Sequence, residues 1–303
     1  MSTPTSPLWK RNVSLLVAGQ TVTMFGSALV GFAVMWHLTL STGSGVILTL
    51  SIVASMVPQA ITSVFGGVWA DRYNRKALII GADAARAVVT LVLALIMVLG
   101  VRNLPLIFVA MALRSALAGI QTPAAGAILP QITPPTQLLR VNGIRETLGA
   151  LDAVIAPGIA AVLYATGSLE LVFAIDVVST VVGIVLLAFI PVTKAVTTAV
   201  AAKGGYFGEL VAGVRYVVKD RSIRWVTLLV AGSLLFLGAP AILTTLMIQR
   251  TFGGETWMLA ANEVAWFAGM MAAGGLIAVL SRRLGSTVRL LVVATVAAAL
   301  FSV

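Results

Sequence analysis

Six charged side chains lie inside long apolar stretches of this sequence. They are Asp83, Arg86, Arg114, Asp152, Asp176 and Glu263. A charge at the centre of a membrane costs on the order of 3 kcal/mol, so each needs a partner or a water-filled cavity. A carboxylate in such surroundings can take up and release a proton, and a nearby arginine can control that exchange. These residues therefore predict proton coupling, or binding of a polar group, within a membrane.

The spacing of these residues divides them into groups. Asp83 and Arg86 are three residues apart and share one face of a helix, where they either neutralise each other or take part in gating. Arg114, Asp152 and Asp176 have no opposite charge within a helical turn, which favours a coupling role. The alternative is that the two acids form buried structural pairs. Glu263, nearer the outer end of its segment, faces cavity water, substrate or the membrane interface.

The composition requires a membrane setting for these charges. The chain has 303 residues, of which 59% are hydrophobic and 10% charged, and its mean hydropathy is +1.06. Soluble domains contain about 25% charged residues. With no cysteine and one histidine, the sequence predicts no metal site and no cofactor. The net charge of +10 comes from cations placed between apolar stretches, so it indicates topology and not a nucleic-acid partner.

About nine segments approach the roughly 20 apolar residues that a membrane helix needs. Their approximate limits are 12–40, 46–70, 77–100, 104–126, 143–166, 168–190, 225–249, 257–280 and 287–303. The last is short, which leads us to expect a chain truncated at its C-terminus. Alternate joints are basic, with Arg72, Arg75 and Lys76 in one of them. By the positive-inside rule these joints and the N-terminus are cytoplasmic, in a bacterial inner membrane.

One long joint divides the chain. We expect an N-terminal six-helix bundle at 1–190, a cytoplasmic linker at 191–224 and an incomplete C-terminal bundle at 225–303. Apolar residues at helical spacing between Phe207 and Val218 predict an amphipathic linker segment, lying on the membrane or in solvent. The stretch from Gly66 to Lys76 resembles that from Gly274 to Leu284, which indicates two like halves unless the match is fortuitous.

The loop after the second segment carries the most specific motif. It reads Gly67-Val-Trp-Ala-Asp71-Arg72-Tyr-Asn-Arg75-Lys76 and resembles the cytoplasmic loop signature of the major facilitator superfamily. The resemblance implies an all-α membrane protein with the major facilitator fold, with about nine of roughly twelve helices present in this chain. It also implies that the loop acts as a conformational gate. On physical grounds we expect Gly67 to permit close helix approach, and Asp71 and the cations to form a charge cluster that latches one half against the other. The alternative is that its cations only anchor the topology.

Two further stretches resemble signatures of drug:proton antiporters. Arg114 followed by Gly119 resembles the fourth-helix signature, and Gly149 with Pro157 and Gly158 resembles the fifth-helix signature. Small residues and proline loosen packing and bend a helix, as an alternating-access element requires. Together these stretches look most like the macrolide and enterobactin exporter branch.

These patterns predict a monomeric transporter that uses protons to export a bulky hydrophobic compound such as a macrolide. A siderophore or lysolipid exporter of the same fold is an alternative, and so is a membrane scaffold or sensor that does not transport. An enzyme is disfavoured because no nucleophile and base, metal-ligand set or nucleotide loop occurs at a useful spacing. The partners expected are therefore a small molecule, protons and the lipid bilayer.

Overall fold

The computed structural model describes residues 8–101, 103–166, 169–191, 215–253 and 255–284, and these residues contain no β-strand. The main elements are α1 (Trp9–Thr42), α2 (Gly45–Arg72), α3 (Arg75–Val98), α4 (Leu104–Ile132), η1 (Pro135–Gln137), α5 (Leu138–Ala165), α6 (Leu169–Ala188), α8 (Arg221–Phe252) and α9 (Thr256–Leu284). The all-α prediction is confirmed for this part of the chain. Each of the six segments expected before residue 190 has a helix.

Six of the helices are long and apolar enough to cross a membrane, namely α1 to α6, with η1 extending α5. In α8 only the shorter stretch Ile223–Gly232 stands out as an apolar helix among the described residues. The expected segment 287–303 and most of the linker lie outside the described residues, although 215–219 are helical. The count of nine membrane helices therefore stays a prediction.

Local signals explain how the first hairpins turn. Gly43 adopts a φ of +60° and donates its N–H to the carbonyl of Thr39, which ends α1. Ser44 and Asn74 then act as N-caps, accepting hydrogen bonds from the N–H groups of Ile47 (3.4 Å) and Ala77 (3.2 Å). The chain thus reverses within a few residues.

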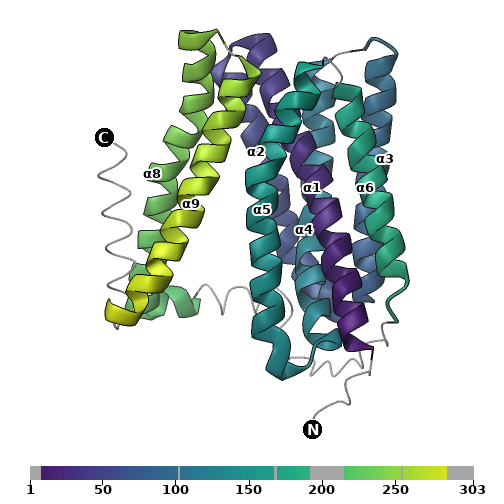
Figure 1. Cartoon of the computed structure of the whole chain (residues 1–303), viewed down its shortest axis with the longest axis vertical. Helices are drawn as coiled ribbons and strands as arrows, with labels where there is room; N and C mark the ends of the chain where they lie inside the picture. The colour runs from purple at the N-terminus through teal and green to yellow at the C-terminus, as the bar shows by residue number, and fades with distance from the viewer. Residues whose placement is uncertain (1–7, 102, 167–168, 192–214, 254, 285–303) are drawn as a thin grey trace.

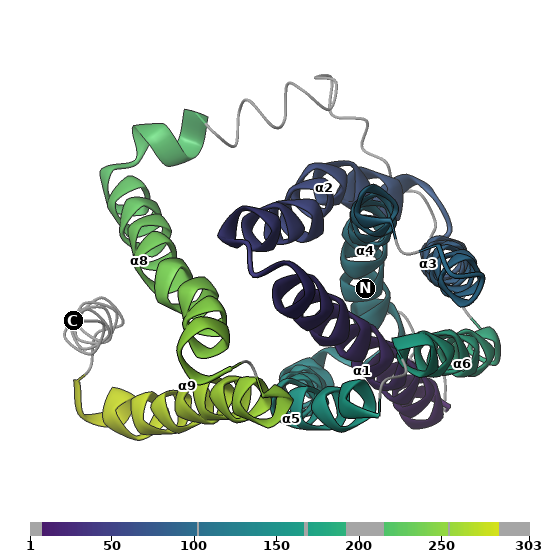
Figure 2. The same ribbon diagram turned by 90° about the horizontal axis from the view of Figure 1, so that it is seen from above.

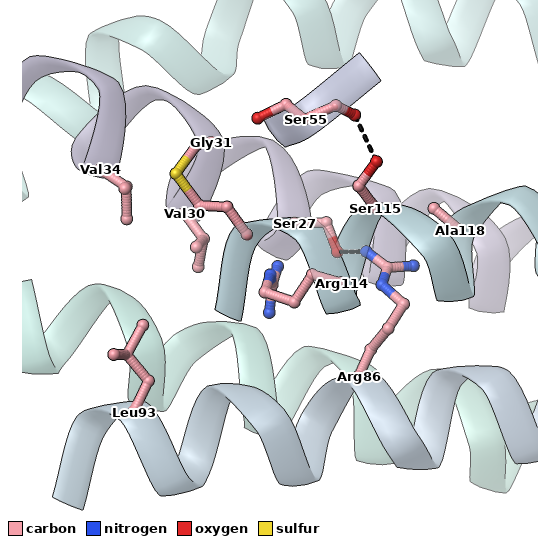
Figure 3. Close-up of a pocket in the computed structure, with 11 residues that line it drawn as sticks. Ser27, Val30, Gly31, Val34, Ser55, Arg86, Leu93, Arg114, Ser115 and Ala118 are labelled. Carbon is pink, nitrogen blue, oxygen red and sulfur yellow. Dashed lines mark hydrogen bonds between the residues drawn. The ribbon is translucent and has the colours of Figure 1, made fainter. Parts of the chain in front are cut away.

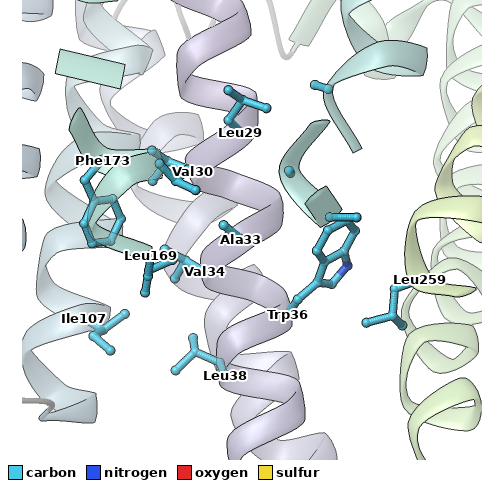
Figure 4. Close-up of a cluster of buried hydrophobic side chains, with 14 of the residues drawn as sticks. Leu29, Val30, Ala33, Val34, Trp36, Leu38, Ile107, Leu169, Phe173 and Leu259 are labelled. Carbon is cyan, nitrogen blue, oxygen red and sulfur yellow. The ribbon is translucent and has the colours of Figure 1, made fainter. Parts of the chain in front are cut away.

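Helices α1 to α6 pack as one bundle, and α8 and α9 stand beside it (Figures 1 and 2). Within the bundle α2 packs on α4, α1 on α5 and α6, and α3 on α4 and α6. Helix α9 packs on α5, and Phe267 meets Phe32 of α1 edge to face with ring centroids 6.5 Å apart. Leu259 of α9 is buried in the same apolar cluster as Trp36 and Phe173 (Figure 4).

Glycines bring two pairs of helices into close contact. A Cβ atom on Gly66 would lie 2.5 Å from the carbonyl oxygen of Gly119, and one on Gly183 would lie 2.9 Å from that of Gly19. Lipid does not drive helices together as water does, so close backbone packing of this kind holds α2 on α4 and α1 on α6. The sequence assigned close approach to Gly67, but a Cβ there would meet nothing within 4 Å. Gly66, one residue earlier and on another face, makes the contact instead.

A serine hydroxyl on α4 forms hydrogen bonds with two backbone groups of α2 beside a proline. Proline has no N–H and its ring displaces the carbonyl four residues earlier, so Pro58 disturbs the hydrogen-bond ladder of α2. The Ser115 hydroxyl donates to the carbonyl of Ser55 (2.5 Å) and accepts from the N–H of Gln59 (3.1 Å). This hydroxyl therefore bridges two ladder groups of α2 and fixes α4 against the proline.

Substituting Gly119 with alanine should destabilise the α2–α4 pair. The new Cβ would lie 2.5 Å from the carbonyl oxygen of Gln59, which is backbone and cannot swing aside. We expect a loss of roughly 1–3 kcal/mol, seen as a lower thermal unfolding midpoint in detergent. Gly126→Ala on the same helix is the matched control, because nothing lies within 4 Å of its added Cβ. Equal midpoints for the two variants would contradict this packing.

Candidate functional site

Four of the six membrane charges converge inside the bundle. Arg114 on α4 pairs with Asp176 on α6, with 2.5 Å between Nη1 and Oδ2. Arg86 pairs with Asp83 on the same face of α3, at 3.4 Å, as their spacing predicted. Both aspartates are only 1% exposed. Burying one such charge alone would be costly, so the two pairs compensate each other's desolvation.

Two hydroxyl groups join the arginines to one carboxylate. Ser27 on α1 accepts a hydrogen bond from Arg86 and donates to Oδ1 of Asp176 (3.1 Å). Thr90 on α3 accepts from Arg114 and donates to Oδ2 of the same aspartate (3.0 Å). Asp176 is therefore the acceptor at which contributions from α1, α3, α4 and α6 meet.

Asp152 and Glu263 contribute no ion pair or hydrogen bond to this network among the described residues. Asp152 on α5 is half-buried, and its Oδ2 atom has no hydrogen-bond partner within the described part of the chain. Glu263 on α9 is also half-buried. The sequence predicted the same candidate role for Asp152 and Asp176, but among the described residues only Asp176 belongs to the charge network.

Three adjoining cavities lie beside the charge network. The central one, of about 150 Å³, is lined by Arg86, Arg114 and Ser27 (Figure 3). It shares Ser27 and Arg86 with a second cavity of about 340 Å³, and it shares Gly31, Ser55 and Met111 with a third of about 390 Å³. The two arginines that hold the aspartates thus also form part of the cavity wall.

The sequence did not single out several residues that the structure brings to this region. Ser27 and Thr90 complete the network, and three glutamines line the second cavity, namely Gln20, Gln59 and Gln121. Amide side chains within apolar helices are unusual, since hydrocarbon offers them no partner. That signal was present in the sequence and could have located the second cavity.

The loop between α2 and α3 is tied to two other helices. Arg75 pairs with Asp71 (3.3 Å) and donates to the carbonyl of Ala127 at the end of α4 (2.7 Å). Lys76 donates to the carbonyls of Ala188 (2.7 Å) and Ile190 (2.8 Å), where α6 ends. Arg72 is exposed and forms no hydrogen bond among the described residues. The motif therefore fastens the same end of α2, α3, α4 and α6.

The antiporter-like stretch of α5 is helical throughout. Pro157 is buried within α5 and does not interrupt it. A Cβ on Gly149 or on Gly158 would meet nothing within 4 Å, so neither glycine is required for close packing in this arrangement. The expected role of Gly149, Pro157 and Gly158 in bending the helix therefore stays a prediction.

The sequence profile of the Major Facilitator Superfamily matches residues 16–303. This chain belongs to the major facilitator superfamily. The resemblance read from the loop motif is thus confirmed, and with its apolar helices the chain is a multi-pass membrane protein.

Known relatives of this major facilitator chain include efflux proteins. Macrolide efflux protein A of Streptococcus pyogenes is 26% identical over 267 residues, which is 88% of this chain and 66% of that protein. The Enterococcus faecalis protein of the same name is 25% identical over 77% of this chain and 72% of its own length. A Na⁺, Li⁺, K⁺/H⁺ antiporter of Planococcus maritimus is 27% identical over 45% of this chain and 32% of its own length. The chain thus spans about two thirds of the streptococcal relative.

Breaking the Arg114–Asp176 pair from one side should be more damaging than replacing both partners. Arg114→Met or Asp176→Leu leaves a buried charge uncompensated, which costs about 3–5 kcal/mol. The double variant removes both charges and should recover much of that loss. The interaction energy of the pair is obtained from thermal unfolding, in detergent, of the wild type, the two single variants and the double variant. Losses that simply add would contradict a direct pair.

Lys76→Met should loosen the end of this major facilitator bundle at which the α2–α3 loop lies. The ammonium group satisfies the carbonyl of Ala188, the last residue of α6, and that of Ile190 just beyond it, and its loss should cost about 1 kcal/mol given its partial exposure. Hydrogen exchange at the end of α6 should rise. Arg72→Met, which removes a cation from the same loop, is the control and should leave that exchange unchanged.

Proposed function

We propose that this chain belongs to a proton-coupled exporter of a bulky, partly hydrophobic compound, which binds in the cavities beside α1, α2 and α4. The observation that carries the proposal is the position of Arg114. One side of its guanidinium group pairs with Asp176, and the residue also lines the central cavity. A proton and a substrate can therefore compete for the same arginine.

Protonation supplies the link between the proton and conformation. When Asp176 takes up a proton, it loses its charge, and the attraction that holds Arg114 at 2.5 Å is lost. The guanidinium group then lacks a counter-charge and turns toward the cavity or toward Asp83. Substrate that occupies the cavity shifts this equilibrium, and the coupling is reciprocal. Asp152 is the second candidate proton carrier, because its Oδ2 has no partner among the described residues.

The cavity lining supports a hydrophobic substrate. The largest of the three cavities, about 390 Å³, contains Phe32, Met35, Met56 and Met111, and methionine adapts to varied apolar shapes. The names of the streptococcal and enterococcal relatives make macrolides the first compounds to test. Siderophores and lysolipids are alternative cargo for the same architecture, and competition against a macrolide would separate them.

The remaining parts follow from the same proposal. We assign residues 1–190 to a six-helix domain, 191–224 to a linker and 225–303 to part of a second bundle that moves against the first. The basic loop faces the cytoplasm, and its Asp71, Arg72, Arg75 and Lys76 act as a gate between the halves. The protein acts as a monomer in the bacterial inner membrane.

Asp176→Asn should abolish proton-driven efflux while the protein still inserts into the membrane. The amide cannot cycle between charged and neutral forms, so a pH gradient can no longer act on Arg114. Efflux of a fluorescent macrolide from proteoliposomes, with and without an imposed pH gradient, measures this. Asp152→Asn tests the second candidate in the same way.

Controls distinguish the parts of the proposal. Glu146→Gln removes an exposed acid of α5 and should leave gradient-driven efflux unchanged. Wild-type efflux that ignores the gradient would refute proton coupling, and full gradient-driven efflux by both aspartate variants would refute the assigned carriers. A chain that binds the macrolide and never moves it would favour the scaffold alternative.

A further inference from the structure

We propose that the cavities select an amphiphile whose polar end is rich in hydrogen-bond acceptors and carries no permanent positive charge; a macrolide with a basic amino sugar would bind as the neutral amine. This rests on the proposed function, because it names the substrate class of the same site. The three cavities form a series along α1: the apolar one contains Ala28 to Met35, and the polar one extends from Leu16 to Ala28. The distance along α1 from Gln20 to Met35 is about 22 Å, enough for a bulky ligand with two distinct ends.

The two ends of this series differ in chemistry. At the apolar end Phe32, Ile52 and the methionines surround the 390 Å³ cavity, and only the hydroxyls of Ser51 and Ser55 are polar. At the other end the lining of the 340 Å³ cavity includes, beside apolar residues, polar side chains from five helices, α1 to α5. They are Gln20, Ser27, Gln59, Gln121, Thr122, Arg86 and Arg145. An amphiphile oriented along the series matches both ends at once.

The polar end offers mainly hydrogen-bond donors. Gln121 donates through Nε2 to Oε1 of Gln20 at 2.5 Å, which leaves the amide N–H groups of Gln20 available. The guanidinium groups of Arg86 and Arg145 can only donate. A carbonyl, hydroxyl or carboxylate group would therefore find several partners here, whereas an ammonium group, which has no acceptor, would find few.

The charge of the cavity walls also disfavours a positively charged ligand. The residues lining the three cavities include Arg86, Arg114 and Arg145, and no carboxylate lines any of them in the described part of the chain. The acids nearest the cations, Asp83 and Asp176, are each only 1% exposed and lie behind the arginines that they neutralise. Arg145 forms no ion pair among the described residues, so it is the cation that remains unbalanced in this wall.

Binding by the full chain in lipid nanodiscs tests the inference. The probes share one dansyl-alkyl body and end in a carboxylate, a hydroxyl or a trimethylammonium group. We expect the carboxylate and hydroxyl probes to bind at least tenfold tighter than the trimethylammonium probe. Arg145→Glu should reverse the order of the two charged probes. Arg140→Glu makes the same charge change at an exposed position of α5 outside the cavities, and should leave the order unchanged.

Each outcome decides a separate point. Tightest binding by the trimethylammonium probe would overturn the inference and leave the proposed export intact. An equal effect of Arg145→Glu and Arg140→Glu would also overturn it, since the selection would then arise from membrane surface charge. If none of the three probes bound saturably to nanodiscs that contain the chain, both the inference and the proposed cavity would fall.

Discussion

The bundle depends on one carboxylate in the membrane interior. Asp176 accepts hydrogen bonds from Arg114, Ser27 and Thr90, so the side chains of three other helices are satisfied only when α6 is in place. An unpaired arginine or aspartate at this depth would cost several kcal/mol. The network therefore fixes the relative positions of α1, α3, α4 and α6 more strictly than apolar packing alone could.

Packing of small residues makes that network possible. Gly26 faces α6 so closely that an added Cβ would lie 3.1 Å from the Cα of Asp176 itself. The neighbouring Ser27 can then reach the carboxylate at 3.1 Å. Glycine and hydroxyl residues thus act together: the first lets the backbones approach, and the second makes the hydrogen bonds that the approach allows. The same combination recurs between α2 and α4, with Gly119 close to Thr62 and Ser115.

The sequence predicted the helices well because hydrophobic length and polar turns are local properties, and Ser44 and Asn74 end their loops as N-caps. It predicted the Asp83–Arg86 pair for the same reason, since three residues along a helix fix the geometry. It could not assign Arg114 to Asp176, because that pair joins helices 62 residues apart in sequence. It chose Gly67 over Gly66 because a motif gives residue types, whereas the contacting face depends on how α2 is rotated against α4. The functional roles of all the candidate site residues remain predictions, those of the charge network and the loop motif as well as Asp152, Glu263, Gly149, Pro157 and Gly158.

The distance in sequence between Ser27 and Asp176, 149 residues, has a consequence for biogenesis. Helices enter the membrane in order during synthesis, so α1, α3 and α4 reach the bilayer before their shared acceptor has been translated. Until α6 emerges, Arg114 lacks its carboxylate partner, and the hydroxyls of Ser27 and Thr90 lack the acceptor that they share on Asp176. The charge network can therefore be completed only when the sixth helix enters the bilayer.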